Sequence, residues 1–236
     1  MLTRLEVNGF KNLVDFSLDF GPYTCIAGPN GVGKSNIFDA IRFLSLLTEH
    51  TINDAALQIR NAGVETGDIE DLFFYGGGKR CQRMKFLAEM IVGANVQDDF
   101  GREAKASSSF LRYEVAFGYA PPSPTAGYLG GLVLEEEKLT HITKGQAARH
   151  LKFPHHKGEF RDSVVYNNRR NSAYISTELD AESGQTTIVV HQDGGSHGRG
   201  GAGAAPRGGG GRKKKKKKNP TPPHHNPGGD KKKKKG

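Results

Sequence analysis

The residues best suited to chemistry form one short glycine-rich segment near the start of the 236-residue chain. Residues 28–35 read Gly-Pro-Asn-Gly-Val-Gly-Lys-Ser and match the whole pattern G-x-x-x-x-G-K-[ST]. Glycines let the backbone come close to an anion, and successive N–H groups can then point inward around a phosphate. Lys34 would reach terminal phosphate oxygens as a point charge, and the Ser35 hydroxyl would bind Mg²⁺. The pattern therefore predicts a phosphate-binding loop.

A strand before this loop and a helix after it are the elements that would position these residues. Tyr23–Ala27 is short, apolar and β-prone, which predicts a buried strand with Cys25 as a small buried side chain. After the loop, apolar residues from Ile37 to Leu47 recur every three or four positions, as on the core face of a helix. Such a helix would direct the positive end of its dipole at the phosphates. The alternative is a glycine-rich turn without a ligand. Such a turn does not require a strand before it and an amphipathic helix after it, so this order of elements favours the phosphate-binding loop.

Further strands are expected on both sides of this unit. Leu2–Val7 and Phe16–Phe20 alternate apolar and polar residues, as half-buried strands do. Later segments indicate an antiparallel meander followed by two short strands. These later expected strands are Met84–Val92, Leu111–Tyr119, Leu132–Leu139, Val164–Tyr166 and Thr186–His191.

The net charge of +9 divides the chain into two parts. Residues 1–193 hold 20 basic and 24 acidic side chains, a net charge of −4, whereas residues 194–236 hold 14 and one, a net charge of +13. The second part is rich in glycine and contains the runs Lys213–Lys218 and Lys231–Lys235. It cannot bury enough apolar surface to offset its chain entropy. We therefore expect a folded lobe over residues 1–193 and a disordered low-complexity tail over residues 194–236, either genuine or the product of a frameshift.

Composition also excludes several classes of protein. No stretch approaches the roughly 20 consecutive apolar residues of a membrane span, so we expect no membrane partner. The two cysteines, Cys25 and Cys81, are too few for a disulfide framework or a cysteine-based zinc site. A cytoplasmic setting is the expectation.

The residues around the loop resemble a known family. Leu5–Leu13 reads Leu-Glu-Val-Asn-Gly-Phe-Lys-Asn-Leu, and the loop runs on into Asn36 and then Ile37–Ile41, Ile-Phe-Asp-Ala-Ile. This block resembles the N-terminal lobe of ATP-binding-cassette-type ATPases of the RecF/SMC/OLD group of AAA family ATPases. The resemblance implies an α/β P-loop NTPase fold, in which the first lobe has a mixed sheet and an antiparallel β meander.

The resemblance also implies a ligand and a set of contacts. ATP and Mg²⁺ would be bound between two paired heads, which makes a homodimer the expected assembly, and in complete relatives this pairing is coupled to DNA transactions such as repair. Lys11 and Asn12 match a position that often approaches the nucleotide, although a solvated turn is an equally open alternative for this pair. Ser35 is the matching metal ligand. The residues that match nucleotide-binding positions are Gly28, Asn30, Gly31, Val32, Gly33, Lys34, Ser35, Asn36, Lys11 and Asn12.

Hydrolysis needs groups that the sequence does not visibly supply. A Walker B aspartate, a catalytic glutamate and a signature loop are all unrecognisable, and Leu132–Glu137 is only the nearest imitation of an acidic strand end. We therefore expect the first lobe alone, truncated or frameshifted, which binds ATP with little or no turnover, and no catalytic residue is assigned. One alternative is a non-hydrolysing nucleotide sensor or scaffold whose basic tail binds nucleic acid. A transporter-type subunit is the other alternative.

Overall fold

The computed structural model describes residues 1–60, 68–97, 101, 103–122, 130–166, 172–179 and 186–191. The expected tail, residues 194–236, lies outside these described residues. Within them, no helix combines the length and the apolar character that crossing a membrane would require.

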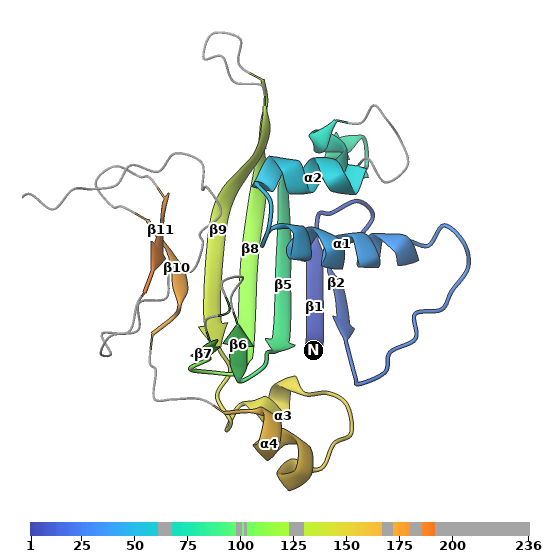
Figure 1. The fold of residues 1–236 in the computed structure, drawn as a ribbon. Coiled ribbons are helices and arrows are strands. Elements are labelled where there is room, and N and C mark those ends of the chain that lie inside the picture. Colours follow the sequence, from blue (N-terminus) through green and yellow to red (C-terminus); the bar gives the residue numbers. More distant parts are fainter. Residues whose placement is uncertain are drawn as a thin grey trace, which may run out of the picture.

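A seven-stranded sheet in the order β11-β10-β9-β8-β5-β1-β2 organises the described residues (Figure 1). All of its neighbouring strands run antiparallel. The expected meander is thus confirmed as β5, β8 and β9, and β1, β2 and β11 are the other strands that were expected. The strands are β1 (Leu2–Asn8), β2 (Phe16–Asp19), β5 (Arg83–Ile91), β8 (Phe110–Ala120), β9 (Gly131–His141), β10 (Ile175–Leu179) and β11 (Thr186–Val190).

Helices are few and short beside this sheet. The expected helix after the loop is confirmed as α1 (Lys34–Leu46), and α2 (Ile52–Arg60) lies across the same face of the sheet (Figure 1). A second group of turns gathers beyond the end of the sheet where β5 finishes (Figure 1). The smaller elements are η1 (Ile69–Leu72), β3 (Tyr75–Gly76), β4 (Lys79–Arg80), β6 (Asn95–Gln97), β7 (Glu103–Lys105), α3 (Ala147–His150), η3 (Lys157–Arg161) and α4 (Asp162–Val164).

Two expected strands are wrong. Tyr23–Ala27 forms no strand, and both Tyr23 and Cys25 are exposed, so Cys25 is not the buried side chain that its position suggested. No strand among the described residues pairs with this segment, and an extended segment becomes a strand only where its backbone groups find partners on a neighbouring strand. Val164–Tyr166 begins within the helical turn α4 instead, because the Val165 N–H donates to the Arg161 carbonyl at 2.9 Å.

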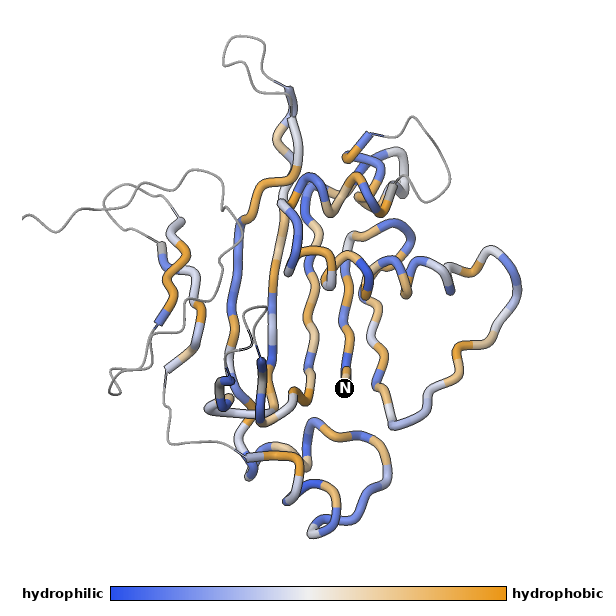
Figure 2. Tube along the Cα trace, viewed as in Figure 1, coloured by the Kyte–Doolittle hydropathy of each residue, from blue (hydrophilic) through white to orange (hydrophobic). Residues whose placement is uncertain are grey.

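The main core lies between the sheet and α1. Alternate residues of β1, Leu5 and Val7, are buried on this side, and α1 contributes Ile37, Ala40 and Phe43. The same alternation of apolar and polar residues is visible along the strands in Figure 2. A cluster of aromatic rings fills the centre of this core, with the Phe43 ring 5.5 Å from the rings of both Phe86 and Phe117 and 6.1 Å from that of Phe10. The core fixes α1 against the sheet and so fixes the position of the loop that precedes it.

Candidate phosphate-binding site

The glycine-rich loop leads directly into the N-terminus of α1. Gly31 and Gly33 have φ values of +84° and +97°, a left-handed conformation that side chains with a Cβ rarely adopt. The Asn36 N–H then donates to the Gly33 carbonyl at 3.0 Å as the helix begins. Glycine is therefore required by the backbone at two positions of the loop, and the loop itself is exposed from Gly28 to Val32.

The Lys34 side chain folds back over the start of the loop. Its ammonium group donates to the carbonyls of Gly28 and Pro29 at 2.7 and 2.6 Å. Ser35 follows in the first turn of α1 and is exposed, and this turn, which is fully described, contains no acidic side chain. An ammonium group, a hydroxyl group and the positive end of a helix thus lie together at one end of α1.

The turn after β1 packs directly against this loop. The Asn36 side-chain amide donates to Asn12 Oδ1 at 2.7 Å, and a Cβ built on Gly33 would collide with the Asn12 amide. Lys11 instead forms an ion pair with Asp39, at 2.6 Å between Nζ and Oδ2. Asn12, Gly33 and Asn36 are therefore in contact, whereas the Lys11 ammonium is directed at a carboxylate one helical turn further along α1.

Asp39 is the site residue that the reasoning from sequence missed. It is the only acidic residue of α1, and it lies four positions after Ser35, on a neighbouring part of the helix surface. That position alone does not identify its partner, because Lys11 is 28 residues away in sequence.

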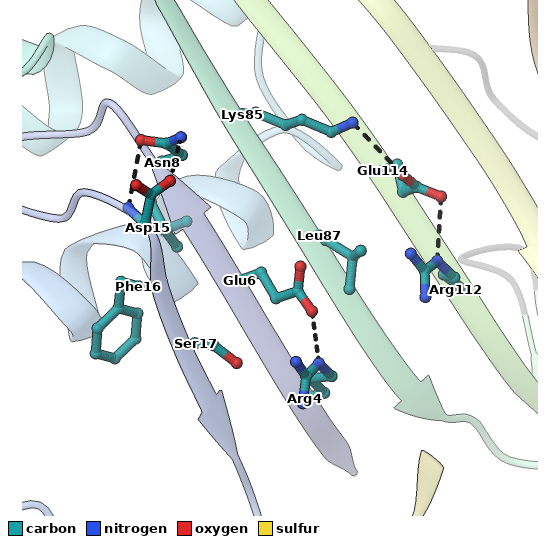
Figure 3. A pocket seen from close by; sticks show the side chains of 11 residues that line it. Arg4, Glu6, Asn8, Asp15, Phe16, Ser17, Lys85, Leu87, Arg112 and Glu114 are labelled. Atoms are coloured by element: carbon teal, nitrogen blue, oxygen red, sulfur yellow. Dashed lines mark hydrogen bonds and ion pairs between the residues drawn. The ribbon is translucent and has the colours of Figure 1, made fainter. Parts of the chain in front are cut away.

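A hollow of about 450 Å³ lies on the opposite face of the sheet, and Figure 3 shows its lining. Its basic side chains already face carboxylates: Arg4 lies 2.6 Å from Glu6, and Arg112 lies 3.1 Å from Glu114. The hydrogen bond with Glu6 raises the pKa of Arg4 further above its ordinary value. Lys85 lies 3.7 Å from Glu114. This mutual neutralisation makes the hollow a poorer place for a polyphosphate than the loop before α1.

The region that contains the loop and α1 is similar to known proteins. Residues 4–110 match the family model described as an AAA domain. The chain is 34% identical over 95 residues to the DNA replication and repair protein RecF of Phocaeicola vulgatus, a match that covers 36% of this chain and 26% of the relative. It is 40% identical over 101 residues to the chromosome partition protein Smc of Bacillus subtilis, covering 42% of this chain and 7% of that protein.

Two further proteins are similar to part of this chain. The OLD nuclease of Thermus scotoductus is 54% identical over 41 residues, covering 17% of this chain and 8% of the nuclease. A solved structure from work on ATP-driven dimerization and DNA-stimulated activation of SMC ATPases aligns with a TM-score of 0.37 and 20% identity, over 64% of this chain and 76% of that one. The matched region spans about a quarter of the RecF relative and less than a tenth of the Smc and OLD relatives.

Proposed function

We propose that the chain binds ATP with Mg²⁺ through residues 28–36. The premise is that its N-terminal region is an AAA domain related to RecF, Smc and the OLD nuclease. The observation that carries the proposal is the complete phosphate-loop pattern at the N-terminus of a helix, with left-handed glycines at 31 and 33. In such a loop the backbone N–H groups and the helix dipole favour an anion together.

Each residue of the loop has a proposed role. Lys34 would exchange its contacts with the Gly28 and Pro29 carbonyls for phosphate oxygens. Asn30 to Asn36 would surround the phosphates mainly through backbone N–H groups, which is consistent with their exposure or closeness to the helix N-terminus. Lys11 and Asn12 lie beside the loop, Asn12 against Gly33 and Asn36 and Lys11 against Asp39.

The residues present fit a magnesium ion that is bound mostly by the nucleotide. Among the described residues, no group of three or more His, Cys, Asp or Glu side chains could enclose a metal ion. Mg²⁺ usually keeps several waters and takes one or two protein ligands together with phosphate oxygens. The exposed hydroxyl of Ser35 would supply one such ligand, and the ion would neutralise phosphate charge there.

We further propose that this chain alone hydrolyses ATP slowly. Phosphoryl transfer depends on positioned carboxylates and on electrostatic stabilisation, and the sequence shows no recognisable Walker B or catalytic glutamate. These groups would come from another polypeptide segment. A turnover number of about 1 s⁻¹ or more, within the ordinary range of enzymes, would contradict this part of the proposal.

Pairing of two heads around ATP and contact with DNA belong to the same proposal, since the names of the relatives concern DNA replication, repair and chromosome partition. The runs Lys213–Lys218 and Lys231–Lys235 support a role for DNA, because clustered lysines neutralise phosphates without regard to sequence. This observation also supports the alternative function, a non-hydrolysing nucleotide sensor with a nucleic-acid-binding tail.

Calorimetric titration of the full chain with ATP and Mg²⁺ tests nucleotide binding. We expect saturable binding by the wild-type chain and an affinity lower by about tenfold to about a hundredfold in Lys34→Ala, since a hydrogen bond to a charged group contributes about 1.5–3 kcal/mol. Lys144→Ala is the control, because Lys144 pairs with Asp162, and both of these residues lie more than 100 positions after the loop in the chain. Equal affinity of the wild-type and Lys34→Ala chains would overturn the proposal.

A further inference from the structure

We infer that Asn12 and the Lys11–Asp39 ion pair are positioning residues that hold the phosphate loop in its binding conformation, and that Lys11 acts through Asp39 instead of contacting phosphate. The inference rests on the proposed function, since it concerns how the same loop is held.

The turn that carries Lys11 is anchored to the core on one side. Phe10 is fully buried and its backbone pairs with Leu13 and Phe73. The Lys11 N–H donates to the Leu72 carbonyl at 2.7 Å. Lys11 itself has a φ of +48°, an uncommon conformation for a residue with a long side chain. These contacts fix the direction in which the side chains of Lys11 and Asn12 leave the turn.

On its other side, this turn contacts the loop at two places. Asn12 lies over the Cα of Gly33 and accepts from Asn36, so its amide fits against the left-handed residue at which the loop becomes helix. Lys11 reaches Asp39 at 2.6 Å, and both side chains are about four-fifths shielded from water, with exposed fractions of 20% and 24%. Partial shielding makes such a pair stronger than a fully exposed one. The turn thus contacts the first and second turns of α1 simultaneously.

The geometry opposes a direct phosphate contact by Lys11. Its ammonium group would have to leave a short ion pair with Asp39, and the carboxylate would then be left without its cation in a partly buried position of the second turn of α1. Lys34, by contrast, contacts only two backbone carbonyls, which remain neutral when it moves. Lys34 is therefore the phosphate ligand, and Lys11 is a positioning residue that acts through Asp39.

Exchanging the charges of Lys11 and Asp39 distinguishes a positioning role of Lys11 from a direct contact between Lys11 and phosphate. We expect Lys11→Ala, Asp39→Asn and Asn12→Ala each to weaken binding of ATP with Mg²⁺ by about fivefold to tenfold, as expected for the loss of one supporting hydrogen bond or ion pair. The double variant Lys11→Asp/Asp39→Lys should regain most of the lost affinity, because it restores the pair with opposite polarity. Aspartate tolerates the left-handed conformation at position 11, so the backbone does not oppose this exchange.

The melting temperature of each variant is measured alongside the titrations. A loss of affinity with an unchanged melting temperature then shows an effect on the conformation of the loop and not a loss of overall stability. Asp39→Asn keeps the shape of the side chain and covers the case in which Lys11→Ala does not fold. The matched control is Lys144→Asp/Asp162→Lys, which inverts another lysine–aspartate pair away from the loop and should leave ATP affinity unchanged.

The outcomes distinguish this inference from the proposed function. If the wild-type chain binds no ATP, or binds it no better than Lys34→Ala does, the proposed function fails. If the wild-type chain binds ATP through Lys34, but Lys11→Ala and Asp39→Asn bind ATP as well as the wild-type chain does, the positioning role of the Lys11–Asp39 ion pair is wrong. If Lys11→Ala loses affinity and the exchanged pair does not recover it, Lys11 is itself a phosphate ligand and the inference is overturned.

Discussion

The Lys34 ammonium group lies 2.7 Å from the Gly28 carbonyl and links the helical end of the loop to its first residue. A second hydrogen bond, to Pro29, has a similar length, 2.6 Å. The group that is proposed to bind phosphate therefore also holds the loop closed on itself. Binding a polyphosphate requires an exchange of two carbonyl partners for phosphate oxygens.

This exchange predicts a change at the lysine nitrogen itself. Adding ATP with Mg²⁺ should shift the ¹⁵Nζ resonance of Lys34, because its hydrogen-bond acceptors change from neutral carbonyls to charged oxygens. The resonance is assigned by its loss in Lys34→Ala and followed by nuclear magnetic resonance. The Lys144 resonance should stay unmoved, and a Lys34 resonance that is equally indifferent to saturating ATP would contradict the exchange.

Gly33→Ala should destabilise the chain more than Gly31→Ala or Gly77→Ala. All three glycines have positive φ, so each alanine costs about 1–2 kcal/mol in backbone strain. Only at Gly33 would the new Cβ also meet a neighbour, the Asn12 amide, whereas Gly31 and Gly77 have open space around that position. Urea unfolding of the three variants measures the difference, and equal free energies of unfolding would show that the Asn12 contact is absent in solution.

Phe43→Ala should lower the free energy of unfolding by about 3–5 kcal/mol, the usual cost of removing a buried aromatic ring. Phe43 is fully buried and packs among three other phenylalanine rings between α1 and the sheet. Phe38→Ala, on the same helix, is the control, because Phe38 is 58% exposed and its removal should change stability by no more than about 0.5 kcal/mol. Similar losses from both variants would mean that α1 does not pack on the sheet by this face.

The sequence predicts this packing because local periodicity carries the information. Ile37, Ala40, Ile41, Leu44 and Leu47 recur at helical spacing, and Leu5 and Val7 recur at strand spacing, so each element indicates its buried face without knowledge of its neighbours. Ile37 and Ala40 are buried as this spacing predicts, whereas Phe43 was not part of the predicted face and is buried beside them. The same reasoning fails at Tyr23–Ala27. An apolar run becomes a strand only beside a hydrogen-bonding partner, and the described strands provide none for it.

The polar and charged contacts of the site could not be predicted from local periodicity for a similar reason. Nothing local connects Lys11 with Asp39 or Asn12 with Gly33; both contacts arise because β1 and α1 pack on the same core. The loop pattern predicted which residues could bind phosphate, but not that Asp39 takes the Lys11 ammonium. Glu137 shows the same limit, since nothing in the local sequence predicts that this carboxylate is buried in β9 next to the Tyr113 hydroxyl, at 3.1 Å.

Glu89→Ala should destabilise the sheet by about 1–3 kcal/mol, because two donors would lose their shared acceptor. Glu89 on β5 is fully buried, and its Oε1 accepts from Arg112 at 3.1 Å and contacts the His150 ring nitrogen at 2.9 Å, which joins β8 and α3 to one carboxylate. Glu135→Ala is the control, since that side chain is 42% exposed and its pair with Arg83 should contribute little. Urea unfolding compares the two, and an equal loss in both variants would contradict a special role for the buried carboxylate.

The lysine runs should control DNA affinity in a way that depends on salt and not on base sequence. Glutamine at all lysines of Lys213–Lys218 and Lys231–Lys235 removes eleven positive charges, so affinity for a duplex at low salt should fall and the plot of log K against log salt should flatten, since that slope counts the phosphates neutralised. The runs contain no aromatic residues for base stacking, so two unrelated duplexes should bind the wild-type chain equally. Fluorescence anisotropy over a salt series measures both effects. Glutamine at Lys144 and Lys152 in the folded lobe is the control, and an unchanged slope in the tail variant would assign any DNA binding to the lobe.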